Sequence, residues 1–306
     1  MRTLKLLAVL LLLAVPALAY AELGQIPNSA TWYFHADFDA MRNGEASRGV
    51  YDWLDTEVFE EIRSEIGIDF DKEVRQMTAF SGADAGPVIM VDGKFSQETR
   101  DKVVAIAAAD GELQTFKSSG KAYYFFDGDG DSTDVGNIDI DIESLEKEAY
   151  VSVALKNKIL VTNTRDQMEA LLANNGKIDA GKKENNALFV LRAERSLIQA
   201  GVNADEMDND DDWDSNILRN TKQVAVLMAD LGDKLGVQAQ LVANEADMAN
   251  SLASIVRGLI SLQAFNDDIE PEIAAVLQST KVDVAGSTLK ISLELDPDTV
   301  VSALED

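Results

Sequence analysis

The sequence contains no cysteine and a single histidine, His35, among its 306 residues. Without cysteine the chain forms no disulfide and has no thiol for redox chemistry. A zinc site would have to combine His35 with three carboxylates, a ligand set that zinc rarely takes. The fold must therefore be stabilised by a packed core, which a chain of this length is large enough to form.

Recognised catalytic and nucleotide-binding motifs are also missing. No G-x-x-x-x-G-K-[ST] or G-x-G-x-x-G stands after a predicted strand, and no G-x-S-x-G nucleophile motif occurs. A catalytic triad would have to use His35, whose same-face neighbours on the predicted strand are Tyr33 and Asp37. We favour a histidine packed on a sheet face over a catalytic one, and the sequence predicts no cofactor.

Basic residues are scarce. The chain has 27 Lys and Arg against 54 Asp and Glu, which gives a formal net charge of -27. Such a chain repels nucleic acid and anionic membrane surfaces, so nucleic acid is not an expected partner. Because 46% of the residues are apolar and clearly periodic, we expect a folded protein rather than a disordered acidic chain.

The longest apolar run lies at the start of the chain, from Leu6 to Val15. Arg2 and Lys5 precede it, Pro16 ends it, and small residues follow up to Ala21. This is the pattern of a cleaved secretory signal over residues 1–21, and the run is shorter than the roughly 20 residues of a membrane-spanning helix. We expect export to the periplasm or the cell exterior, with no membrane insertion after cleavage.

Hydrophobic periodicity predicts hairpins covered by helices. Gln223–Leu231 and Lys234–Val242 read as paired strands, and an amphipathic helix follows with an apolar stripe that includes Met248 and Leu252. The same order occurs over Arg75–Ala109. Thr31–Phe38 alternates as a half-buried strand.

The predicted fold class is therefore α+β, with two tandem modules over residues 22–177 and 187–306 and a polar linker at about 178–186. Each module is expected to be a mainly antiparallel sheet covered by amphipathic helices. The repeated order suggests internal duplication, although hairpins alternating with helices also occur in proteins that have none.

Two acidic inserts are candidate calcium loops. Their aspartates have the one-three-five spacing of an EF-hand loop: Asp127, Asp129 and Asp131 in the first, Asp208, Asp210 and Asp212 in the second. Glycine is absent from the sixth position and glutamate from the twelfth in both. Weak cation binding is one interpretation, and two solvated acidic loops are the simpler one.

The segments Thr31–Asp37 and Trp213–Asn220 resemble parts of uncharacterised secreted proteins of Gram-negative bacteria. This resemblance implies no activity, ligand or catalytic residue.

We interpret the chain as an exported, acidic, non-enzymatic binding or interaction protein. Trp32, Tyr51 and Trp53 are candidates for a contact patch, the alternative being that they pack in the core. A second hypothesis is a periplasmic hydrolase that uses a pair of Asp or Glu residues in a cleft between the modules. A third is a calcium-responsive scaffold.

Overall fold

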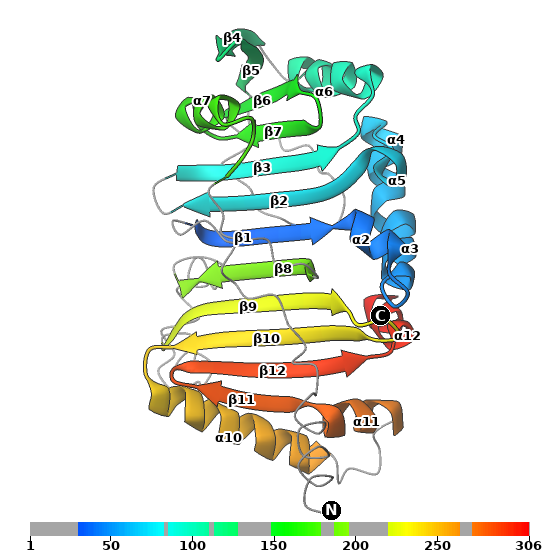
Figure 1. Ribbon diagram of the computed structural model, residues 1–306, viewed down its shortest axis with the longest axis vertical. Coiled ribbons are helices and arrows are strands. Elements are labelled where there is room, and N and C mark those ends of the chain that lie inside the picture. Colours follow the sequence, from blue (N-terminus) through cyan, green and yellow to red (C-terminus); the bar gives the residue numbers. More distant parts are fainter. Residues whose placement is uncertain are drawn as a thin grey trace, which may run out of the picture.

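The computed structural model describes residues 30–82, 85–109, 113–127, 148–178, 187–195, 220–263 and 271–305. Twelve strands form one antiparallel sheet in the order β11-β12-β10-β9-β8-β1-β2-β3-β7-β6-β5-β4 (Figure 1). The strands are β1 (Ala30–Asp37), β2 (Val74–Gly82), β3 (Ala85–Gly93), β4 (Gln114–Ser118), β5 (Lys121–Asp127), β6 (Glu148–Leu155), β7 (Lys158–Thr162), β8 (Ala187–Glu194), β9 (Thr221–Asp230), β10 (Leu235–Ala243), β11 (Lys281–Ala285) and β12 (Thr288–Leu295).

Helices connect these strands. They are α2 (Phe38–Asn43), α3 (Arg48–Leu54), the π-helical turn η2 (Asp55–Phe59), α4 (Glu60–Ile66), α5 (Phe70–Glu73), α6 (Gln97–Ala109), α7 (Arg165–Ala173), α10 (Ala246–Gln263), α11 (Pro271–Ser279) and α12 (Pro297–Glu305). The predicted α+β class is confirmed, and so are the two predicted hairpins, which are β2–β3 and β9–β10, each followed by a helix.

The expectation of two separate sheets is wrong. β1 pairs with β2 on one side and with β8 on the other, so strands from both halves of the chain belong to a single sheet. Most of the predicted linker lies outside the described residues.

The two faces of the sheet are covered by different helices. One face carries Phe34, Met77 and Met228, which pack with α2 to α5 and α12 in the largest core cluster. α10 packs on the same face, against Leu241 and Ile291. The opposite face carries Val88, Met90 and Leu160, which pack against α7. Since side chains alternate along a strand, α7 lies on the opposite side of the sheet from α10.

The helices α2 and α3 that follow β1 are separated at residues 44–47. The Asp230 carboxylate at the end of β9 lies where a side chain on Gly44 would be, so this position requires glycine. Asp230 Oδ2 accepts hydrogen bonds from the Ser47 hydroxyl at 2.7 Å and from the Ser47 amide at 3.0 Å. This contact joins the first helical segment to the second half of the sheet.

Candidate functional site

An uninterrupted row of apolar side chains crosses the middle of the sheet. Seven residues on seven neighbouring strands stand opposite one another in register: Ile291, Ala239, Val226, Leu191, Phe34, Ala79 and Ile89. Because cross-strand partners project from the same face, these side chains form one continuous strip, which we call the central row.

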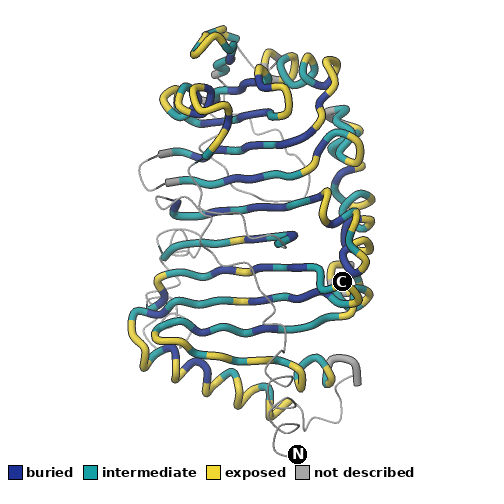
Figure 2. The backbone as a smooth tube through the Cα atoms, viewed as in Figure 1, coloured by how far each residue is buried: buried dark blue, intermediate teal, exposed yellow. Residues whose placement is uncertain are grey.

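No helix or strand that the structure describes covers the middle of the central row. Leu191 is 43% exposed and Val226 is 39% exposed, and Ala239 beside them is exposed as well. At the β2 position Ala79 is only 5% exposed. Figure 2 shows the exposed positions as interruptions in the middle of β8, β9 and β10. Exposed apolar side chains on adjacent strands make a contiguous patch, which is typical of a binding surface.

Packed elements border this patch on two sides. Phe34 and Phe189 meet edge to face, with ring centroids 5.5 Å apart, where the central row joins the core cluster of α2 to α5. On the side of β12, α10 packs over Ile291. The remaining large exposed apolar side chains among the described residues lie on α6, α10 and α12: Ile106, Ile255, Leu259, Leu262 and Leu304.

A second, parallel row lies towards the other end of the strands. Leu241, Val224, Ala193 and Trp32 are cross-strand partners on the same face, and all four are half-buried. We call these four residues the second row. Trp32, one of the three predicted contact residues, therefore belongs to the border of the uncovered patch.

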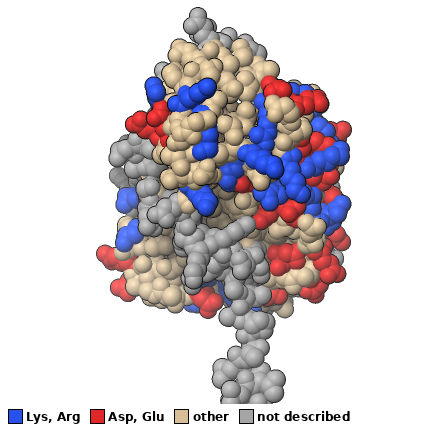
Figure 3. All heavy atoms as spheres, turned by 45° about the horizontal axis from the view of Figure 1, so that its top comes forward, with Lys and Arg blue, Asp and Glu red and all other residues tan. Residues whose placement is uncertain are grey.

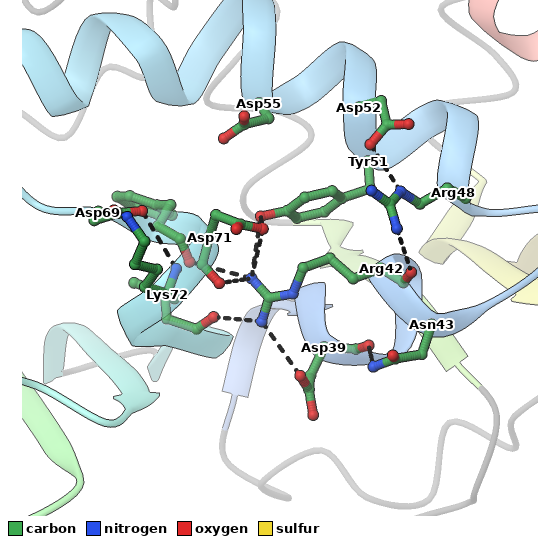
Figure 4. Close-up of polar contacts among 12 residues, drawn as sticks. Asp39, Arg42, Asn43, Arg48, Tyr51, Asp52, Asp55, Asp69, Asp71 and Lys72 are labelled. Carbon is green, nitrogen blue, oxygen red and sulfur yellow. Dashed lines mark hydrogen bonds and ion pairs between the residues drawn. The ribbon is translucent and has the colours of Figure 1, made fainter.

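The other two predicted contact residues lie in the helices. Tyr51 is 2% exposed and packs in the largest core cluster, and Trp53 on α3 is half-buried. The Tyr51 hydroxyl accepts a hydrogen bond from Arg42 at 3.0 Å and donates one to Asp71 at 3.2 Å (Figure 4). Its burial leaves Trp32 and Trp53 as the members of the predicted patch that a partner can reach.

Arg42 organises the helices beside the sheet. Its guanidinium donates to Asp39 and to three carbonyl groups at the entrance of β2, and it lies 5.1 Å from the Tyr51 ring centroid. The three carbonyls belong to Phe70, Asp71 and Val74. These contacts hold α2, α3 and α5 together. They also occupy the Arg42 guanidinium.

His35 lies on the face opposite the central row and is 8% exposed. Its Nδ1 lies 2.8 Å from the Thr78 hydroxyl, and its ring stacks on Tyr33 with centroids 6.4 Å apart. Burial raises the pKa of Tyr33 to about 12, against a smaller lowering by the hydrogen bond to Thr78. Tyr33 therefore stays protonated at neutral pH and supplies no base to His35.

Most of the residues of the two predicted calcium loops lie outside the described residues. Asp127 is the last residue of β5, and Asp129, Asp131, Asp208, Asp210 and Asp212 lie outside the described residues. Within the ranges that the structure describes, no three His, Cys, Asp or Glu side chains gather closely enough to hold a metal ion.

The charged side chains beside the sheet are largely paired with one another. Figure 3 shows Lys and Arg intermixed with Asp and Glu over the helices along the strand ends. Short ion pairs there include Arg63 with Asp55 at 2.7 Å and Lys72 with Asp69 at 2.6 Å. None of the helices that the structure describes is long and apolar enough to cross a membrane.

Comparison with known proteins identifies no family. No family model and no curated protein matches the sequence. Among solved structures, the chain is similar to crystal forms III, IV and I of TP0453 at 10% identity, with TM-scores of 0.48, 0.47 and 0.39. The matches cover 92–94% of this chain and 96–97% of TP0453. A likeness at this level carries no inference about function.

Sequence reasoning missed the central row. The available signal was the segment Val224–Ala229, which is apolar at every position and therefore on both faces of its strand. A strand of that kind is normally covered on both sides. Periodicity alone cannot show that the helices leave one of those faces open.

Proposed function

We propose that this protein is an exported, non-enzymatic binding protein whose binding surface is the uncovered middle of the central row. One observation carries the proposal: Leu191 and Val226 are cross-strand partners, 43% and 39% exposed, within a row that contains no polar side chain. Full burial of such a side chain stabilises a complex by about 1.5–3 kcal/mol relative to leaving it in water. Because Leu191 and Val226 are already more than half buried, a partner that covers them gains about two-fifths of this energy, about 0.6–1.2 kcal/mol for each side chain.

Export is part of the same proposal. Its support is the basic, apolar and small-residue pattern over residues 1–21 and the complete lack of cysteine, which leaves the fold independent of the redox state of its compartment.

The hydrolase hypothesis has no comparable support. Asp92, the most deeply buried carboxylate among the described residues at 6% exposure, forms an ion pair with Lys158 across β3 and β7. Its partner is a lysine, whereas the hypothesis requires a second carboxylate.

We further infer that the chain is an internal duplication centred on the β1–β8 pair. Outwards from this pair, the sheet continues as β1, β2, β3, β7 and β6 on one side and as β8, β9, β10, β12 and β11 on the other. The two halves therefore have the same strand order. β4 and β5 extend the first half.

Matching backbone hydrogen bonds support the duplication. At the end of β3, the Gly93 amide donates to the carbonyl of Asn157 in the β6–β7 turn at 3.0 Å. At the end of β10, the Ala243 amide donates to the carbonyl of Ser287 in the β11–β12 turn at 2.8 Å. On this interpretation the Phe34–Leu191 pair marks the joint between two repeats, and the uncovered patch lies beside that joint.

The binding surface is tested with Nile red, an uncharged dye that fluoresces on apolar surfaces. We expect Leu191→Asp and Val226→Asp each to weaken dye binding at least tenfold, because a buried carboxylate without a partner is strongly unfavourable. Leu304→Asp is the matched control, since Leu304 is 42% exposed on α12. Equal dye binding by the wild type and both row variants, or an equal loss in the control, would refute the proposal.

A further inference from the structure

The uncovered patch has a basic end. Along β9, Val224 and Val226 alternate onto the same face, and the exposed Lys222 lies just before them, at the bulge where the pairing of β9 with β10 shifts between Val242 and Ala243. Arg195 directly follows β8, whose register pairs Ala193 with Val224 and Glu194 with Gln223. Continuing that register brings the Arg195 backbone to the same end of the sheet as Lys222.

Lys222 has no acidic partner among the described residues. Other cations of the sheet do: Lys158 is paired with Asp92, and Arg192 with Glu194 at 2.8 Å. The Lys222 amine has only a long contact of 3.5 Å with the Asn244 carbonyl. A cation that is available beside an apolar strip favours an anionic ligand group.

The two features occur in a fixed order along the strands. From one end to the other, β9 carries the exposed Lys222 at its bulge, then the half-buried Val224 of the second row and the exposed Val226 of the central row. β8 carries Ala193 and Leu191 on the patch face, and Arg195 directly follows its last residue, Glu194. Beyond the central row the face is closed by the core cluster of α2 to α5.

From this order we propose that the patch binds an amphiphile with one apolar chain and an anionic head. The apolar chain lies over the second and central rows, and the head group lies at Lys222 and Arg195. Trp32 borders the patch as the cross-strand partner of Ala193 and contacts the part of the chain next to the head. This inference rests on the proposed function, since it names the ligand class for the same surface.

Two quantitative expectations follow from this ligand class. Each added methylene in the apolar chain strengthens binding about three- to fourfold while the chain still lies over the rows. The anionic head adds about three- to fivefold over a neutral head at low salt, the usual gain from a solvent-exposed ion pair. Salt reduces that second gain and leaves the first unchanged.

The test is displacement of Nile red by three twelve-carbon compounds that differ in their heads. We expect dodecanoate and dodecyl phosphate to displace the dye at lower concentrations than dodecanol, and the order of the two anions distinguishes a carboxylate from a phosphate head. Lys222→Ala should abolish the advantage of the anions without changing displacement by dodecanol, and Lys222→Arg should restore it. Lys281→Ala, at an exposed lysine on β11, is the control for loss of a positive charge.

The outcomes separate the inference from the proposed function. If dodecanol competes as well as the two anions, or if Lys222→Ala leaves their advantage intact, the amphiphile assignment is overturned while the apolar binding surface stands. If Nile red binding still depends on Leu191 but none of the three twelve-carbon compounds displaces the dye, the amphiphile assignment also fails. If the dye does not depend on Leu191 or Val226 at all, the proposed function fails first.

Discussion

Replacement of Asp230 by alanine tests how the helices are attached to the sheet. The carboxylate at the end of β9 accepts hydrogen bonds from the Ser47 hydroxyl and amide, and from the Gly232 amide at 2.7 Å. Partial burial favours the neutral acid, but the hydrogen bonds from Gly232, Ser47 and Ala46 outweigh it and hold the pKa of Asp230 below its ordinary value.

The expected loss follows from the groups left without partners. Ser47 is completely buried, and in the variant its hydroxyl can turn its single proton to the Met41 carbonyl, 3.1 Å away, so mainly the Ser47 amide is left unsatisfied. An orphaned buried donor costs about 1–3 kcal/mol, and the lost bonds to a partly exposed carboxylate add about 1 kcal/mol. We expect Asp230→Ala to lower the free energy of unfolding by about 2–4 kcal/mol, and the melting temperature of a chain of this length by about 3–6 °C.

Thermal unfolding followed by circular dichroism measures this loss, with Asp233→Ala as the control. Asp233 lies in the same turn and is exposed. Because the pKa of Asp230 is lower in the folded protein than in the unfolded chain, its stabilisation is complete above its ordinary value of 3.8 and disappears as the pH falls through the folded value. The gap between wild type and Asp230→Asn should therefore close below about pH 4. Equal melting temperatures for the Asp230 and Asp233 variants would refute this reasoning.

Two further predictions concern other buried polar groups. Arg100 on α6 donates to three carbonyls at the end of β6, those of Val153, Leu155 and Lys156. Arg100→Met should lower the free energy of unfolding by about 2 kcal/mol, whereas Lys102→Met on the same helix should cost under about 0.5 kcal/mol, as chemical denaturation will show. The second prediction is that an ultraviolet absorbance titration will find Tyr33 among the tyrosines still protonated near pH 11, since burial raises its pKa to about 12 and burial also raises the pKa values of Tyr51 and Tyr123. Tyr33→Phe should lower the amplitude of the late step by one tyrosine, and an unchanged amplitude in the variant would contradict the assignment.

Local features of the fold could be predicted from the sequence. The β9–β10 hairpin and α10 were predictable because adjacent segments carry strand and helix periodicities separated by a turn with Gly232. Gly232 has a φ of +101°, a conformation that glycine adopts without strain.

Long-range features could not be predicted. The pairing of Phe34 with Leu191 joins residues far apart in the chain, and no local pattern specifies which strand lies beside β1. The burial of Tyr51 depends on Arg42 and Asp71 folding around it, and the exposure of Leu191 depends on where the helices stop. Composition predicts neither the burial of Tyr51 nor the exposure of Leu191, so the site could be recognised only from the assembled sheet.

The β1–β8 pairing has a consequence for the order of assembly. When synthesis or translocation proceeds from the amino terminus, β2 and β3 are available to β1 long before β8 emerges. Until then β1 presents a free edge of unpaired amides and carbonyls next to Trp32 and Phe34, which is a template for pairing with another molecule. Pairing of β8 with this edge is a contact of long sequence separation, and such contacts form slowly. A chaperone that shields nascent β1 would therefore have its greatest effect on yield before β8 is complete.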